Sequence, residues 1–103
     1  MYNDEDDTPA APVSDAHGDW RIEVSIDCHP AAISRVLDPI VRQGVVPRRL
    51  VAEIVGDDIF VMLEFAALDG QKAERIIALF QTLPSVSSVT WRRLHPPELG
   101  EIA

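Results

Sequence analysis

Regular hydrophobic patterning begins at Trp20, where apolar and polar side chains take alternate positions along the chain. The apolar positions are Ile22, Val24 and Ile26, and the polar positions between them are Glu23, Ser25 and Asp27. A period of two is typical of a strand that buries one face and exposes the other. We therefore predict a first strand over residues 20–27, with its aliphatic side chains in the core.

The hydrophobic period changes after this strand, and a helix is predicted. Apolar residues recur at spacings of three and four, at Ile33, Val36, Leu37, Ile40 and Val41. One helix face holds all of them. The helix is expected to begin near Pro30 and to end at Gln43-Gly44, where glycine adopts a left-handed cap. Pro39 lies inside the helix and removes one backbone hydrogen bond, so a tolerated kink is expected there.

A hairpin and a second helix follow. Alternation runs through residues 49–55 and 59–65, and Gly56-Asp57-Asp58 makes a tight turn between them. Asp69 is placed to cap the second helix, and Pro84 stops it. Its apolar stripe is Ala73, Ile76, Ile77 and Phe80, with Leu83 at its end. A final strand is predicted from Val86 to Arg92.

This order of elements predicts an α+β fold with the ferredoxin-like βαββαβ plan. In that plan two helices pack on one face of a four-stranded antiparallel sheet with strand order 4-1-3-2, and the other face is left bare. If the alternate residues from Ile59 to Phe65 form the core, Phe60 and Met62 point to the bare face. They are either part of a contact surface or scattered surface hydrophobes.

Charge is concentrated at the two ends of the chain. Residues 1–19 contain six acidic residues and no Lys or Arg, whereas residues 20–95 contain nine acidic and nine basic residues. We expect a disordered acidic tail over residues 1–19, a single folded domain over residues 20–93, and a C-terminal tail over residues 94–103. The net charge of −8 argues against binding to nucleic acid or to an anionic membrane.

Cysteine and histidine usage favours the cytoplasm and argues against a metal site. Cys28 is the only cysteine, so no disulfide forms within the chain. The acidic start is unlike a signal peptide, and no apolar stretch approaches the roughly 20 residues that cross a bilayer. His17, His29 and His95 lie far apart in the chain, and no second cysteine stands at ligand spacing.

Several functions that occur on this fold require residues that this chain lacks. An RNA-recognition domain stacks bases on aromatic residues of two central strands, but the first strand offers only Trp20 at its edge, and Glu64 puts a negative charge on that face. A copper-carrying domain needs two cysteines at the first strand–helix junction. No nucleophile with a base, and no paired acid and base, is evident, so we predict neither an enzyme nor a cofactor.

Both connections of the first helix resemble a known family. Asp27-Cys28-His29-Pro30-Ala31-Ala32-Ile33 leads into the helix, and Arg42-Gln43-Gly44-Val45-Val46 leaves it. Over about residues 21–92 the chain resembles the ACT domain family of amino-acid-sensing modules. Within that family it is most similar to the short small subunit of acetolactate synthase. The segments that carry this likeness are residues 22–25, 35–37 with 41–44, and 86–89.

The resemblance implies a non-catalytic regulatory subunit. Such subunits pair side by side into a longer sheet, so a homodimer is expected. They bind and activate the acetolactate synthase large subunit, which carries thiamine diphosphate and FAD and condenses pyruvate with pyruvate or 2-oxobutyrate in branched-chain amino-acid biosynthesis. A second class of function keeps the fold without that enzyme: a free-standing ACT-like dimer that binds another small molecule or regulates another protein.

The resemblance also implies a site for an amino-acid effector, whose carboxylate meets backbone N–H groups where the first helix begins. The corresponding positions are Cys28, His29, Ala31, Ala32, Ile33 and Val46. Ala31 stands at a glycine position of valine-responsive relatives, and Cys28 and Val46 stand at asparagine positions. Weak or absent valine feedback is therefore expected. His29 is either a ligand contact or an exposed loop histidine, and Cys28 is expected to be a buried thiol that only packs.

Arginines at strand ends are the remaining candidates for function. Arg48 and Arg49 open the second strand, and Arg92 and Arg93 end the last one. They either pair with acids on a partner or serve as solvated charges that block unwanted strand pairing. The predicted partner interface is Arg48, Arg49, Phe60, Met62 and Arg92.

Overall fold

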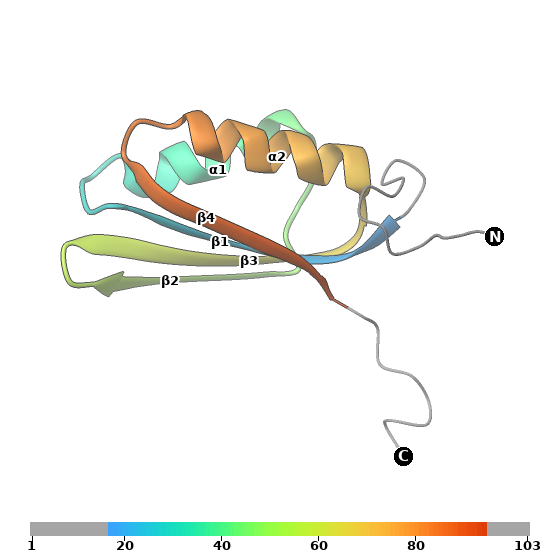
Figure 1. The fold of residues 1–103 in the computed structure, drawn as a ribbon, viewed down its shortest axis with the longest axis horizontal. Coiled ribbons are helices and arrows are strands. Elements are labelled where there is room, and N and C mark those ends of the chain that lie inside the picture. The colour runs from blue at the N-terminus through green and yellow to red at the C-terminus, as the bar shows by residue number, and fades with distance from the viewer. Residues whose placement is uncertain (1–16, 95–103) are drawn as a thin grey trace, which may run out of the picture.

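The computed structural model describes residues 17–94, and its elements follow the predicted order (Figure 1). The elements are β1 His17–Asp27, α1 Ala32–Arg42, β2 Arg49–Val55, β3 Asp58–Asp69, α2 Gly70–Thr82 and β4 Val86–Leu94. The tail predictions for residues 1–16 and 95–103 lie outside the described residues. Residues 17–19 and Leu94 were assigned to the tails, but they belong to β1 and β4: His17 and Gly18 pair with the end of β3, and Leu94 pairs with Asp19.

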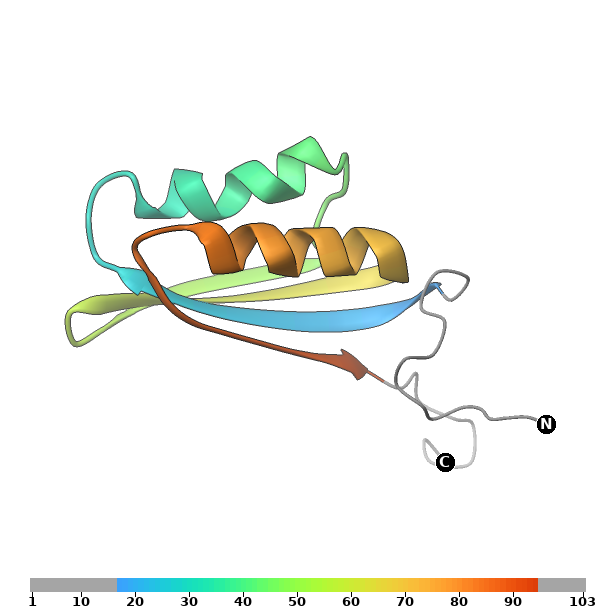
Figure 2. The ribbon, with the colours of Figure 1, turned by 45° about the horizontal axis from the view of Figure 1, so that its top comes forward.

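The four strands form one antiparallel sheet in the order β2-β3-β1-β4. Both helices lie side by side over the same face of this sheet, and the opposite face has no helix over it (Figures 1 and 2). The predicted ferredoxin-like fold and its strand order are therefore confirmed. The two edge strands of the sheet are β2 and β4, which we call the β2 rim and the β4 rim.

The hydrophobic core lies between the helices and the two central strands. Ile22, Val24 and Ile26 are completely buried, as their alternation predicted. They face the apolar stripe of α2 and the buried side of α1. The other core residues include Ile59, Val61, Leu63, Phe65, Val36, Ile40, Ala73, Ile76 and Phe80. None of the helices within residues 17–94 is long and apolar enough to span a bilayer.

Helix α1 continues through Pro39 and ends at its predicted glycine. Gly44 has a left-handed backbone with φ of 69°, and its N–H donates to the carbonyl of Val41 at 2.9 Å. The next amide, of Val45, donates to Ile40 at 3.3 Å. These two bonds satisfy carbonyls that a helix end otherwise leaves without partners. The helix begins at Ala32, and Pro30 lies in the turn before it.

Helix α2 has the predicted cap and the predicted end. The side chain of Asp69 accepts a hydrogen bond from the amide of Gln71 at 2.9 Å. This bond satisfies one of the free N–H groups of the first helical turn. The backbone becomes extended at Leu83, directly before Pro84. Both ends of the helix therefore follow from local chemistry.

A β-bulge interrupts the pairing of β1 with β3 near the start of β1. Gly18 pairs with Leu68 and Trp20 pairs with Phe65, so two residues of β3 lie opposite Asp19. The amide of Ala67 donates to the Asp19 carboxylate at 3.1 Å. Ala67 has a positive φ of 53°, a conformation that costs an L-residue about 1–2 kcal/mol.

We expect Ala67→Gly to raise the free energy of unfolding by about 0.5–1 kcal/mol. Glycine adopts this backbone without a steric cost, and its larger loss of entropy on folding offsets only part of that gain. The measurement is denaturant unfolding followed by circular dichroism. Ala66→Gly is the matched control, since Ala66 has a negative φ and the same change there is expected to lower stability by about 0.5–1 kcal/mol. Equal losses in both variants would contradict the role of the positive φ.

Candidate functional site

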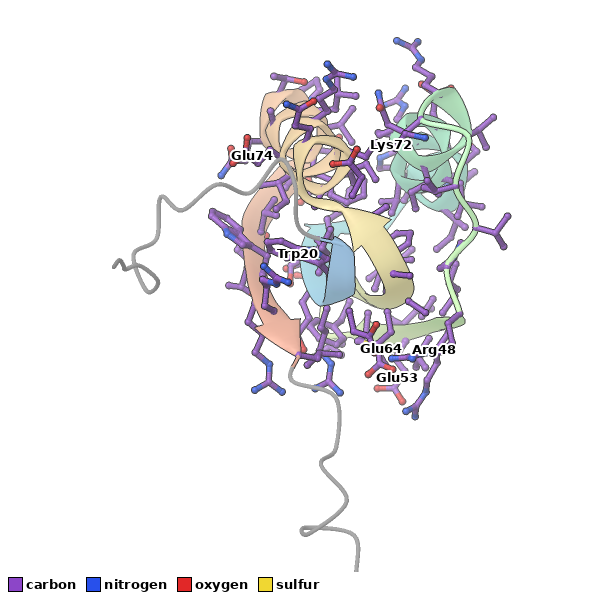
Figure 3. All side chains as sticks on the ribbon, turned by 90° about the vertical axis from the view of Figure 1, so that its right-hand side faces the viewer. Trp20, Arg48, Glu53, Glu64, Lys72 and Glu74 are labelled. Atoms are coloured by element: carbon purple, nitrogen blue, oxygen red, sulfur yellow. The ribbon has the colours of Figure 1, made fainter. Side chains whose placement is uncertain are left out.

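The face of the sheet without helices carries ordered rows of side chains. We call it the bare face. At the end where β1 begins, one row crosses all four strands and consists of Arg49, Glu64, Arg21 and Arg92. The next row is Val51, Met62, Glu23 and Thr90, and the one after it is Glu53, Phe60, Ser25 and Ser88. Figure 3 shows Glu53 and Glu64 on the side of the sheet away from the helices.

Phe60 and Met62 lie on the bare face, and neither is fully exposed there. Met62 is only 9% exposed, and Phe60 is half-buried. Their cross-strand neighbours include Glu23 and Glu53, and side chains of this length lay their aliphatic parts over adjacent apolar surface. The sequence pattern gave the direction of the two side chains correctly, but it did not reveal how far their neighbours cover them.

An ion-pair network crosses the bare face near the start of β1. The Arg21 guanidinium donates to Glu64 Oε2 from Nε at 3.1 Å and from Nη2 at 2.6 Å. The other carboxylate oxygen, Oε1, lies 3.7 Å from Nη2 of Arg48, and Arg48 Nη1 lies 3.3 Å from Asp19 Oδ2. Glu64 is the one buried charged residue in the part of the chain that the structure describes. Because the Asp19 carboxylate also accepts the hydrogen bond from the Ala67 amide, Asp19 links this network to the bulge.

The pKa of Glu64 is lowered from its usual value of 4.5, chiefly because Arg21 donates to the carboxylate. Burial acts in the opposite direction, and the charges of Arg21, Arg49 and Arg48 lower the pKa further. The antiparallel register places Arg21 directly opposite Glu64. This pair could not be predicted from the sequence, because Arg21 and Glu64 are 43 residues apart and the register that pairs them is not visible in either strand alone.

We expect Glu64→Gln to remove part of the acid sensitivity of folding. A carboxylate whose folded pKa is depressed stabilises the protein above its unfolded pKa and loses this effect as the pH falls through the folded pKa. The melting temperature of the natural chain should therefore exceed that of the variant at pH 7, and the difference should shrink toward pH 3. Glu74→Gln is the control, because Glu74 is exposed and makes no ion pair within residues 17–94. A difference that stays constant with pH would contradict the prediction.

The junction between β1 and α1 holds most of the predicted ligand positions. The amide of Cys28 donates to the carbonyl of Asp57 at 3.0 Å, which ties this junction to the β2–β3 turn. The amide of Ala32 donates to the carbonyl of His29 at 2.9 Å, so one N–H at the helix start is already occupied. Ala31 is the residue before the helix and makes no side-chain cap.

The residues of this junction differ in their exposure to solvent. Cys28 is exposed, so the expectation of a buried thiol is wrong. His29 is half-buried, and its Nε2 is buried without a hydrogen-bond partner among the described residues. Ala32 is fully buried, and Ile33 packs partly buried against the core. Of the six ligand positions, Cys28 and Val46 expose the most surface.

Val46 lies at the opposite end of α1 from the other predicted ligand positions. It is 85% exposed in the loop that leads to β2. The 11 residues of α1 separate it from Ala31, a length of about 16 Å at about 1.5 Å per residue. Within one copy of the chain, the six positions therefore do not form one site.

The β2 rim is the most exposed part of the sheet. Of its seven residues only Val51 is half-buried, and the other six are exposed. Leu50 and Ile54 point to the helix side, yet Leu50 is 42% and Ile54 is 71% exposed. Val41 on α1 is exposed as well. This apolar rim could not be predicted from the sequence, because the same alternation in β2 fits a covered strand and an uncovered one.

The β4 rim differs from the β2 rim in its charge. Its sequence contains Arg92 and Arg93 and no acidic residue. Arg93 lies over the ring of Trp20, with 5.5 Å between the guanidinium carbon and the ring centroid. A shallow open hollow lies between β1 and β4, lined by Arg21, Glu23, Thr90, Trp91 and Arg92. Arg48 and Arg49 are exposed at the start of β2, at the opposite edge of the sheet from β4.

Comparisons with known proteins support the fold but no closer assignment. Neither the protein-family models nor the curated proteins match this sequence. Among solved structures, the ACT domain of GTP pyrophosphokinase from Chlorobium tepidum is 13% identical, covers 76% of this chain and 86% of its own, and has a TM-score of 0.60.

Two further solved structures share the arrangement. A homoserine dehydrogenase from Thiobacillus denitrificans has a TM-score of 0.70 at 15% identity; the match covers 87% of this chain and 20% of the dehydrogenase. The C-terminal domain of the MgtC protein from Mycobacterium tuberculosis has a TM-score of 0.60 at 21% identity, over 76% of this chain and 88% of that domain. The chain therefore has an ACT-like fold of the ferredoxin-like class.

Proposed function

We propose that this chain is a non-catalytic regulatory subunit that works as a homodimer, and that its partner is the large subunit of acetolactate synthase. The observation that carries the proposal is the β2 rim, an edge strand with exposed apolar side chains on an ACT-like fold. An uncovered edge strand pairs readily with another strand. The resemblance of residues 22–25, 35–37 with 41–44, and 86–89 to acetolactate synthase small subunits supplies the choice of enzyme.

The placement of the ligand positions supports pairing through β2. The end of β2 lies near Cys28, because Asp57 in the following turn accepts the Cys28 amide hydrogen bond. The start of β2 follows Val46, at the other end of α1. In a two-fold antiparallel pair of β2 strands, the start of one strand lies beside the end of the other. Val46 of a second copy would then approach Cys28 and Ala31 of the first.

The row of Arg49, Glu64, Arg21 and Arg92 on the bare face supports a separate contact with the large subunit. Arg92 and Arg49 stand at the two ends of that row and make no ion pair within residues 17–94. Exposed arginines suit acidic surfaces on a partner, where they mainly set orientation and the rate of association. In this proposal the β2 rim pairs two copies, and the bare face meets the enzyme.

Acetolactate formation by the cognate large subunit, with and without this chain, tests the proposal. We expect the chain to co-purify with the large subunit and to raise its activity several-fold. Arg92→Glu should abolish this activation while leaving the circular dichroism melt unchanged. Arg35→Glu is the control, since Arg35 is an exposed residue of α1 with no ion pair among the described residues. Absence of co-purification would exclude this enzyme as the partner.

Valine feedback is expected to be weak or absent in this complex. Ala31 adds a methyl group at a glycine position, Val46 lacks the amide of the asparagine expected there, and the Ala32 amide already donates to the carbonyl of His29. Isothermal titration with valine should show no binding in the micromolar range. Micromolar binding that is lost in Val46→Asp would contradict this expectation.

A second candidate is a free-standing ACT-like dimer that regulates another protein or binds another small molecule. The observation in its favour is that the same arrangement occurs in proteins with unrelated names, including the MgtC C-terminal domain and the GTP pyrophosphokinase ACT domain. A stable dimer without any effect on a large subunit would favour this candidate.

A further inference from the structure

Arginines are concentrated at one end of the sheet. The end where β1 begins and β4 ends carries five arginines on its strands and their borders: Arg21, Arg48, Arg49, Arg92 and Arg93. At the opposite end, the β1–α1 turn and the β2–β3 turn with their flanking residues carry Asp27, Asp57 and Asp58 and no Lys or Arg. The arginine end also carries Asp19, Glu64 and Asp69, so it keeps an excess of two positive charges, whereas the opposite end is negative.

Arg92 is available to bind an anion on the bare face. It is exposed and makes no ion pair or side-chain hydrogen bond with any residue between 17 and 94. It lines the hollow between β1 and β4 together with Arg21 and Thr90. Glu23 also lines the hollow, and it accepts a hydrogen bond from Thr90 at 3.3 Å. Arg21 binds Glu64, so Arg92 supplies the free positive charge.

The acidic segment of the chain enters the fold at this same end. Residues 1–16 contain Asp4, Glu5, Asp6, Asp7 and Asp15 and no Lys or Arg. They lead directly into β1 at His17, and Asp19 pairs with Leu94 at the end of β4. Ten residues of extended chain span up to about 33–36 Å. Arg21 lies four residues into β1, about 13 Å from His17 at the usual strand rise, so Asp7 can reach Arg92.

We propose that the acidic run from Asp4 to Asp7 binds its own bare face at the hollow between β1 and β4, with Arg92 as its main contact. Exposed ion pairs are individually weak and are screened by salt. The segment is joined to β1, however, so its effective concentration at the hollow is in the millimolar range. A site with a Kd of about 1 mM is then about half occupied. The bound segment shields the bare face, and any acidic partner of that face must displace it. The inference depends on this chain alone and not on the identity of the partner.

The test compares backbone amide chemical shifts in the full chain. We expect D4N/E5Q/D6N/D7N to shift the amides around Arg21, Thr90 and Arg92 at low ionic strength, because it removes the bound charges. These shift differences should fade at high salt and should not depend on protein concentration. In an Arg92→Gln background the same four changes should leave those amides unmoved. In an Arg35→Glu background the shifts should remain, because Arg35 lies on α1.

Three results would overturn the proposal. The amide chemical shifts of β1 and β4 could be identical with and without the four acids. The differences could grow with protein concentration, which would assign the bound segment to a second copy. They could also persist in Arg92→Gln, which would place the contact elsewhere. A chain that fails here can still activate a large subunit, so this result and the test of the proposed function are independent.

Discussion

A chain carrying Ile54→Lys is expected to sediment as a monomer at concentrations where the natural chain sediments as a dimer. Ile54 is 71% exposed on the β2 rim, and it points to the side of the sheet that the helices occupy. Burying an isoleucine side chain contributes about 1.5–3 kcal/mol, and a two-fold interface uses the residue twice. Losing about 4 kcal/mol corresponds to a rise in the dimer Kd of about a thousandfold.

Ser88→Lys is the matched control for this prediction. Ser88 is an exposed residue of β4, the other rim, so the same charge is added at the opposite edge of the sheet. Sedimentation velocity over a dilution series measures both variants. The assignment of the dimer to β2 fails if Ser88→Lys dissociates it and Ile54→Lys does not. A natural chain that stays monomeric at every concentration would remove the dimer from the proposed function.

Phe80→Ala is expected to lower the free energy of unfolding by about 3–5 kcal/mol, the largest stability effect that we predict. Phe80 is completely buried on α2 and is among the largest fully buried side chains of the core. Its removal leaves a cavity between the helices and the sheet. The total stability of a small domain is about 0.05–0.15 kcal/mol per residue, so this variant should be partly unfolded at physiological temperature.

Denaturant unfolding measures this loss, with Gln81→Ala as the control. Gln81 is the next residue of α2 and is exposed, so its replacement should change stability by less than about 0.5 kcal/mol. Because dimerisation adds to apparent stability, both variants are compared at one protein concentration. A loss below about 1 kcal/mol in Phe80→Ala would mean that α2 does not cover the sheet as the structure shows.

The sequence predicted the elements because their signals are local. The alternation at Ile22, Val24 and Ile26 needs only the two-residue period of a strand. Gly44 and Asp69 mark helix ends through the chemistry of one or two neighbouring residues. Strand order then followed from the short connections and the handedness of the crossovers. Errors in these predictions are confined to boundaries, such as the start of β1.

The candidate site was less predictable, because exposure and charge pairing depend on distant residues. Met62 has the pattern of an outward-facing apolar residue, but it is only 9% exposed. Cys28 looked like a buried thiol and is exposed. The Arg21–Glu64 pair depends on the register between β1 and β3, which the bulge at Asp19 shifts.

By itself, the sequence determined the order of strands and helices, the composition of the core and the acidic segment before β1. Only the tertiary structure decided that the β2 rim is uncovered, that Val46 lies apart from Cys28, and that five arginines gather where the acidic segment enters. The physical reason is range. Hydrophobic periodicity and helix caps act over a few residues, whereas exposure and electrostatics are set by whichever strands and helices become neighbours in space.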